Sequence, residues 1–244
     1  MEKNLIYGRN PVYEYLNQGS KIAGATLYVS EKAHGKIINQ ILSKAKAKEL
    51  AIFYQGKDFF EKIGTSSVHQ GVALKLKDIQ KPSLEENEFL TQVASRQGTL
   101  VLLDQLTDPH NVGSIIRTSE ALGVDGVIIP RDNSVSITPA VIKSSAGATA
   151  HLKIIKINNV AAFLRKAKEI GFWIVSTSDH GSDDLNNLKK IKPAIIVIGS
   201  EGKGIRRLTE VESDYLVKIP LKGKISSLNA SVAAGIIIYS LLKD

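Results

Sequence analysis

Cysteine is absent from the 244 residues of this chain. Its absence excludes disulfide bonds and zinc sites built on thiolates, and it is typical of proteins that work in a reducing compartment. Histidine cannot replace it as a metal ligand by simple spacing, because the five histidines are scattered: His34, His69, His110, His151 and His180. We therefore expect no metal cofactor.

Long apolar segments are missing as well. The first twenty residues carry Lys3, Arg9 and Glu14 and no apolar core of signal-peptide length. The uncharged stretch at residues 225–242 has four polar residues among its first seven positions, which leaves too few apolar residues to span a bilayer. We expect a cytoplasmic protein without a membrane partner, and we interpret the apolar run at 232–242 as a buried helix.

Negative charge is in the minority, with 24 Asp and Glu against 32 Lys and Arg, a net charge of +8. Residues 1–76 hold eleven basic and six acidic residues, a difference of +5, so the rest of the chain supplies only +3. Such an imbalance suits a phosphate backbone, to which basic contacts give affinity rather than sequence choice. Scattered lysines on an ordinary soluble protein would give the same count, so charge alone leaves both interpretations open.

What the sequence does contain is a regular alternation of short apolar runs with helix-period segments. This alternation predicts an α/β fold with a mainly parallel sheet. Residues 77–98 mix Pro, Gly and charges and are interpreted as a linker with one short helix. The predicted organisation is a small domain at 1–76, the linker at 77–98 and a second domain at 99–244. The strands expected in the two domains lie at 25–29, 51–54 and 71–76, and at 100–104, 126–130, 152–155, 172–176, 195–199 and 215–219.

Helices are expected between most of these strands. In the small domain they begin at Asn10, with Pro11 in the first turn, and cover about 31–49 and 58–63.

Polar residues follow three of the strands predicted for the second domain. In such sheets ligands bind outside the carboxyl ends of the strands, so these positions are the informative ones. After the strand at 100–104, a turn leads into a helix that we expect to begin near Asn111, with Arg117 six residues further on. The asparagine is most simply an N-cap, whereas a guanidinium on a mostly apolar helix must find a carboxylate, a phosphate or an interface.

The other two loops follow the strands at 195–199 and 215–219. The first reads "GSEGKG" and combines three glycines with Glu201, so backbone amides can approach a ligand there. It has the spacing of neither a Walker A loop nor a dinucleotide fingerprint, and no serine of the chain sits in a Gly-x-Ser-x-Gly elbow. The second ends in Ser227 and Asn229 before the apolar helix, which either residue can cap.

In order and spacing, the three loops resemble the signature motifs of the SpoU/TrmH family of RNA 2′-O-ribose methyltransferases, in the SPOUT superfamily. The matching segments are "DPHNVGSIIRTSEALG", "GSEGKG" and "IPLKGKISSLNASVAAGI". The segments "IYGRNPVYEYL" and "VHQGVAL" also resemble the N-terminal RNA-binding domain of the ribosomal-RNA branch, which has a fold like ribosomal protein L30e. Within that branch the chain is most similar to enzymes that methylate a guanosine in the peptidyl-transferase-centre P loop of 23S rRNA.

The resemblance implies S-adenosylmethionine as methyl donor, 23S rRNA as substrate, a homodimer, and a SPOUT catalytic domain tied in a deep trefoil knot. It further implies that backbone groups at Gly199, Ile219 and Leu228 hold the cofactor. Five side chains are implied in catalysis: Asn111, Arg117, Glu201, Ser227 and Asn229.

In the family, the counterpart of Arg117 is proposed to take the proton from the ribose hydroxyl. A guanidinium is normally a donor only, so a second role is to clamp a phosphate and align the hydroxyl. Other functions stay open, namely methylation of another rRNA or tRNA site, antibiotic resistance by rRNA methylation, and RNA binding in ribosome assembly without catalysis. An oxidoreductase is disfavoured by the failed dinucleotide fingerprint.

Overall fold

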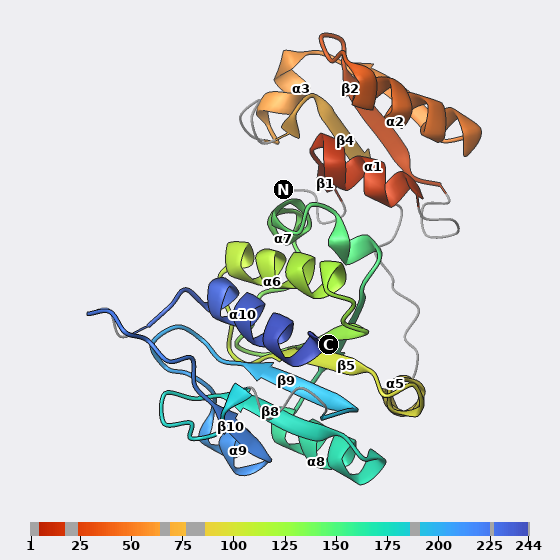
Figure 1. The fold of residues 1–244 in the computed structure, drawn as a ribbon. Coiled ribbons are helices and arrows are strands. Elements are labelled where there is room, and N and C mark those ends of the chain that lie inside the picture. Colours follow the sequence, from red (N-terminus) through yellow and green to blue (C-terminus); the bar gives the residue numbers. More distant parts are fainter. Residues whose placement is uncertain are drawn as a thin grey trace. The chain divides into compact units, whose positions relative to one another are not determined.

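The computed structural model describes residues 5–17, 24–63, 69–76, 86–185, 191–224 and 227–243, and its contacts divide the chain into two compact units (Figure 1). The first unit comprises Met1–Pro82 and Ile137–His151, and the second comprises Ser83–Ser136 and Leu152–Asp244. None of the helices in the described ranges is long and apolar enough to cross a membrane.

The first unit contains a four-stranded mixed sheet of order β1-β4-β2-β3. Strands β1 and β2 run antiparallel to β4, and β3 runs parallel to β2. Helices α1 and α2 bury one face of the sheet, while the short α3 packs on the other face. The bounds are β1 (Leu5–Tyr7), α1 (Arg9–Asn17), β2 (Thr26–Ser30), α2 (Lys36–Ala47), β3 (Ala51–Gln55), α3 (Lys57–Glu61) and β4 (Val72–Lys75).

Residues 137–151 form α7 (Pro139–Ser144) and a 3-10 turn (Ala148–Ala150), and they pack with the first unit. Ile142 and Ala150 are buried in the same core cluster as α1 and α2, and the Tyr15 hydroxyl lies 3.4 Å from that of Thr149. The sequence placed this segment in the second domain. Its packing with the first is therefore a difference from the expected boundaries, and it arises from tertiary contacts between residues more than 120 positions apart.

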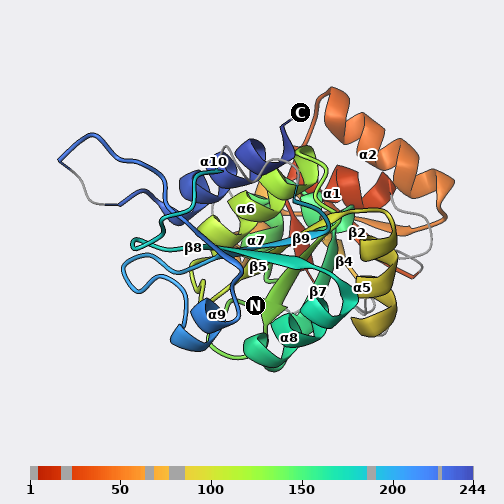
Figure 2. The same ribbon diagram turned by 60° about the horizontal axis from the view of Figure 1, so that its bottom comes forward.

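The second unit confirms the predicted α/β fold with a parallel sheet. Its six strands have the order β10-β8-β9-β5-β6-β7, and every neighbouring pair is parallel. Figures 1 and 2 show α6 and α10 side by side on one face, with α8 on the other, where α5 and α8 share one core cluster with the strands. The bounds are α5 (Glu86–Ser95), β5 (Thr99–Leu103), α6 (Pro109–Ala121), β6 (Gly126–Pro130), β7 (Lys153–Ile157), α8 (Val160–Ile170), β8 (Trp173–Thr177), β9 (Ala194–Ile198), α9 (Arg207–Val211), β10 (Tyr215–Val217) and α10 (Ala230–Leu242).

The strand order reverses beside β5. From β5 the chain moves through α6 to β6 and then to β7, whereas β9 and β8 lie on the opposite side of β5. Loops that leave the carboxyl ends of β5 and β9 therefore diverge, and a crevice at such a point is the usual ligand site of an open α/β sheet.

Candidate functional site

Three polar side chains from the three loops meet in one hydrogen-bonded cluster. Asn229 Nδ2 donates to Glu201 Oε1 at 2.7 Å and to Asn111 Oδ1 at 2.9 Å. Asn111 Nδ2 lies 3.3 Å from the same Glu201 oxygen, which also accepts from the backbone N of Ala230 at 2.8 Å. A carboxylate that accepts three bonds is held in place, so these loops are fixed relative to one another.

Helix α6 begins earlier than the sequence predicted. Asp108 is its N-cap and accepts from the backbone N of His110 and Asn111, at 3.1 and 3.2 Å. Pro109 occupies the first turn, where its missing N–H costs nothing. The expectation that Asn111 caps this helix was wrong, and its 9% exposed side chain instead joins the polar cluster.

Helix α10 is capped by Asn229, whose Oδ1 accepts from the backbone N of Ser231 at 3.0 Å and of Val232 at 3.4 Å. Its amide nitrogen makes the two cluster bonds described above, so one side chain both caps the helix and joins the loops. Ser227 precedes the cap and does not serve as one.

The loop after β9 closes on itself. The backbone N of Ser200 donates to Gly204 O at 3.0 Å, and the backbone N of Gly204 donates to Ser200 O at 2.9 Å. Gly204 has a φ of 64°, in the left-handed region that favours glycine. A Cβ on Gly199 would lie 2.4 Å from the carbonyl carbon of Gly204, so only glycine fits at this strand end.

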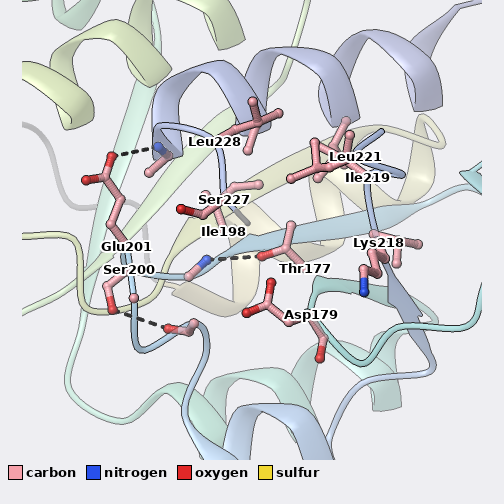
Figure 3. Close-up of a pocket in the computed structure, with 18 residues that line it drawn as sticks. Thr177, Asp179, Ile198, Ser200, Glu201, Lys218, Ile219, Leu221, Ser227 and Leu228 are labelled. Atoms are coloured by element: carbon pink, nitrogen blue, oxygen red, sulfur yellow. Dashed lines mark hydrogen bonds between the residues drawn. The ribbon is translucent and has the colours of Figure 1, made fainter. Parts of the chain in front are cut away.

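A cavity of about 310 Å³ lies against this loop (Figure 3). All three positions at which cofactor binding was predicted line it, namely Gly199, Ile219 and Leu228, and so do Glu201 and Ser227. Asn111 and Asn229 are not among the lining residues and touch the cavity only through Glu201. The structure thus places the predicted cofactor positions and the polar cluster at adjoining places.

Arg117 is the predicted site residue that the structure brings neither to the cluster nor to the lining of the cavity. It lies six residues beyond Asn111 on α6, a rise of about 9 Å. Its side chain is exposed, and within the described residues it has no hydrogen bond or ion pair. The guanidinium is therefore available to an anion or to another chain.

The sequence-based reasoning missed two residues at the carboxyl end of β8, the last residue of the strand and one that follows it. Thr177 Oγ1 accepts from the backbone N of Gly199 at 3.3 Å, and Asp179 lines the cavity (Figure 3). Both stand at a strand end, so the rule that singled out the other three loops would also have found this one. Asp179 is the second carboxylate beside the cavity, after Glu201.

A buried ion pair fixes the other end of the glycine loop. Asp104, which is fully buried, accepts from the backbone N of Arg206 at 3.0 Å, from its Nε at 2.7 Å and from Thr209 Oγ1 at 2.8 Å. Sequence reasoning treated Asp104 only as the end of a strand, because its partner Arg206 is 102 positions away. The pair connects the carboxyl end of β5 to the loop after β9.

No three His, Asp or Glu side chains are grouped to hold a metal ion anywhere in the described ranges. The predicted polar residues at the site are one carboxylate, Glu201, the amides of Asn111 and Asn229, and the Ser227 hydroxyl. These groups orient and donate hydrogen bonds, which suits a reaction on a bound polar substrate.

Comparison with known proteins extends over nearly the whole chain. Residues 98–239 match the model of the SpoU rRNA Methylase family, and residues 5–82 match that of RNA 2'-O ribose methyltransferase substrate binding. A putative TrmH family tRNA/rRNA methyltransferase of Staphylococcus aureus is 38% identical, with 100% of this chain and 97% of the relative covered. The Bacillus subtilis protein YacO, which carries the same description, is 34% identical over 99% of this chain and 96% of its own.

Among solved structures, the SpoU methyltransferase AviRb from Streptomyces viridochromogenes, in complex with AdoMet, superposes with a TM-score of 0.80. It is 24% identical, with 98% of this chain and 89% of that one covered, so it shows the fold alone. Together with the two family models and the full-length relatives, these matches show that the chain belongs to the SpoU family of RNA methyltransferases.

Proposed function

We propose that this chain transfers a methyl group from S-adenosylmethionine to a ribose 2′-hydroxyl of RNA. The observation that carries the proposal is the cluster of Asn111, Glu201 and Asn229 beside a cavity whose wall at Gly199 leaves no room for a side chain. Three loops far apart in sequence each contribute one polar side chain to one place. A structural role would not require that convergence, whereas holding a substrate in one orientation does.

The residues that line the cavity fit such a cofactor. Apolar side chains, among them Ile219, Leu221 and Leu228, lie on one side in Figure 3, while Thr177 and Asp179 lie opposite. An adenine ring can pack against the apolar wall, and backbone groups at Gly199 can meet its edge. When bound, the cofactor supplies an electrophilic methyl group on a sulfonium. Crystal structures with AdoMet in family members from Streptomyces viridochromogenes and Sinorhizobium meliloti support this assignment.

The polar cluster would orient the ribose. Glu201 is fixed by its three donors, and Ser227 lines the cavity with an exposed side chain, so its hydroxyl is available to substrate. We assign Asn111, Glu201, Ser227 and Asn229 to substrate positioning and Arg117 to the phosphate next to the target ribose. In that role Arg117 aligns the hydroxyl while the hydroxyl proton passes to solvent water, and the guanidinium stays a donor throughout.

We propose a guanosine in the P loop of 23S rRNA as the target. Support comes from the basic excess of residues 1–76 and from the match of residues 5–82 to a substrate-binding model. A tRNA target is the second candidate, since the relatives in Staphylococcus aureus and Bacillus subtilis are described as tRNA/rRNA methyltransferases. The N-terminal unit favours rRNA because it adds a separate RNA-binding surface.

A homodimer is part of the proposal. Val232, Ile236 and Tyr239 lie on one side of α10 at a spacing of four and three residues, and they are 51%, 38% and 53% exposed. An exposed apolar stripe of this kind favours burial by a second chain. Sedimentation of the full chain tests the dimer, and a monomer at all concentrations would contradict it. We also propose that the C-terminal segment is threaded as a trefoil knot and that the N-terminal unit has the L30e-like fold.

The decisive experiment is transfer of tritium from labelled S-adenosylmethionine to total rRNA, and in parallel to tRNA, from a strain that lacks this gene. We expect label in 23S rRNA at one guanosine ribose, mapped by resistance of the 2′-O-methylated linkage to alkaline cleavage. Label found only in tRNA would contradict the rRNA target and make tRNA the substrate. The absence of transfer, together with no cofactor binding by calorimetry, would favour a non-catalytic RNA-binding protein.

A further inference from the structure

The sheet of the first unit carries a row of aromatic side chains across its strands. Tyr7 of β1 lies opposite Ala73 of β4, Ala73 lies opposite Tyr28 of β2, and Tyr28 lies opposite Phe53 of β3. Residues directly opposite each other point to the same face of a sheet. Three rings and one small residue therefore share one face, with Ala73 leaving room between Tyr7 and Tyr28.

Next to this row is a second cavity, of about 340 Å³. Its walls are mostly aromatic and aliphatic, and Tyr28 and Phe59 form one of them, with ring centroids 4.7 Å apart. Phe53 stacks on Tyr28 outside the cavity, at 6.0 Å between centroids and 27° between planes. The described residues that line the cavity are Leu5, Tyr7, Tyr28, Phe59, Lys62, Ile63 and Pro139.

A tyrosine hydroxyl is available to a ligand in this cavity. Tyr7 lines the cavity and is 7% exposed as a residue, while its hydroxyl is not enclosed by protein atoms and makes no hydrogen bond among the residues that the structure describes. A tyrosine at such a place offers an apolar ring and a polar tip together. Burial also raises the pKa of Tyr7, so the hydroxyl stays a neutral donor at physiological pH. A ligand with a polar edge would complete the hydrogen bonding of this group.

The charges nearby indicate the class of ligand. Lys62 is the charged residue among those lining the cavity, and its side chain is exposed. The surrounding segment, residues 1–76, carries the +5 excess. A flat ring with apolar faces, a polar edge and an attached phosphate would satisfy the aromatic walls, the Tyr7 hydroxyl and the Lys62 ammonium together. An unstacked nucleobase in a single-stranded RNA segment has all of these features.

We propose that this cavity binds one unstacked base of the RNA substrate and that the Phe53 ring stacks the next base. The site reads RNA on a sheet face, as four-stranded RNA-recognition sheets do with their exposed aromatic residues. It deepens the proposed function, because it rests on RNA being the substrate, but it lies in the first unit and makes no use of the cofactor cavity. Nucleotides held here are recognised through their ring faces, so the site favours single strands over duplex.

The test compares two variants on adjacent positions of β3. Phe53 and Tyr54 are 51% and 58% exposed and point to opposite faces, so neither change threatens folding. Binding of the full-length chain to a fluorescein-labelled single-stranded RNA, and to its duplex, would be measured by anisotropy. We expect Phe53→Leu to weaken single-strand binding about 5- to 100-fold, Lys62→Gln to weaken it less, and Tyr54→Leu to leave it unchanged. Equal affinities for Phe53→Leu and Tyr54→Leu would overturn the proposal.

A second measurement covers the cavity itself. RNA that contains 4-thiouridine, photo-crosslinked to the wild-type chain, should yield adducts on peptides that carry Tyr28 or Phe59. Adducts confined to other peptides would overturn the site even if Phe53→Leu weakens binding. Calorimetry with S-adenosylmethionine separates the two proposals, because Phe53→Leu should bind the cofactor as wild type does. Normal methyl transfer with normal RNA affinity in Phe53→Leu would remove the base site and leave the proposed function standing.

Discussion

The two sheets of this chain present their useful residues in different ways. Strands β5, β6 and β9 of the second unit are buried at every position, whereas β3 of the first unit is buried at none. Parallel strands covered on both faces can offer chemistry only at their ends. The mixed sheet of the first unit has helices on both faces, but its edge strand β3 leaves rings such as Phe53 exposed. From this comparison we predict that RNA affinity and methyl transfer can be changed separately in this protein.

The substitution Arg117→Lys should separate RNA affinity from methyl transfer most strongly. The lysine keeps the charge but loses the fork of donors that holds a phosphate in one orientation. We expect methyl transfer to fall at least about 100-fold while RNA affinity, which we propose is carried mainly by the first unit, is retained. Tritium transfer and RNA anisotropy measure the two quantities. Arg165→Lys on α8 is the matched control, and unchanged turnover in Arg117→Lys would remove Arg117 from the mechanism.

Asp104→Asn should destabilise the second unit alone. The amide cannot satisfy Arg206 and Thr209 as the carboxylate does, and the unfolding free energy should fall by about 2 kcal/mol. That is less than the loss for a fully buried pair, because the Arg206 side chain is 35% exposed. Trp173, the single tryptophan, lies on β8 and reports urea unfolding of this unit. If the amides of β2 and β4 lost protection from hydrogen exchange instead, the prediction that only the second unit is destabilised would be contradicted.

Gly199→Ala tests whether the loop after β9 shapes the cofactor cavity. The new Cβ would meet backbone of Gly204, which can give way only by moving the loop. We expect the affinity for S-adenosylmethionine to fall about tenfold or more by calorimetry, with RNA affinity unchanged. Gly223→Ala is the control, since a Cβ there meets nothing within 4 Å. Equal cofactor affinity in both variants would place the cofactor elsewhere.

Asn229→Ala distinguishes a helix cap from a substrate-positioning residue. Loss of the cap alone should cost about 1 kcal/mol of unfolding free energy and leave methyl transfer intact. Because Asn229 also bonds Glu201 and Asn111, we expect transfer to fall by more than the stability loss explains. Asn159→Ala, which removes the cap of α8, is the matched control for stability, and equal turnover in the two variants would reduce Asn229 to a cap.

Most of the second unit could be predicted because its buried parallel strands are continuous apolar runs, which the sequence displays directly. Strand β1, at Leu5–Tyr7, was missed because three residues are too few to show a period. Helix α2 begins at Lys36, later than expected, because Gly35 has a φ of 114° and cannot be part of the helix. The packing of residues 137–151 depends on contacts that no local pattern records.

The candidate site was predictable in its parts but not in its assembly. The resemblance singled out Asn111, Glu201 and Asn229, yet their mutual hydrogen bonds follow from a strand order that local periodicity does not give. The Asp104–Arg206 ion pair could not be predicted either, because it too depends on the strand order. The aromatic row on the first unit depends on register, since a slip of one residue in β3 would replace Phe53 with a residue of the opposite face.

The smallest expected effect is an acid sensitivity confined to the first unit. Burial, aided by the charge of Lys143, holds the pKa of His69 below its ordinary value of 6.5, and His69 Nδ1 accepts from the backbone N of Gly71 at 2.9 Å. The unfolded chain therefore binds a proton more readily than the folded one. The resulting stability is present above pH 6.5 and is lost as the pH falls through the lower pKa of the folded state. Amide exchange between pH 7.5 and pH 5 should show β2 and β4 losing protection before β5 and β9, and His69→Gln should abolish the difference; equal losses in both sheets would assign the acid sensitivity to other groups.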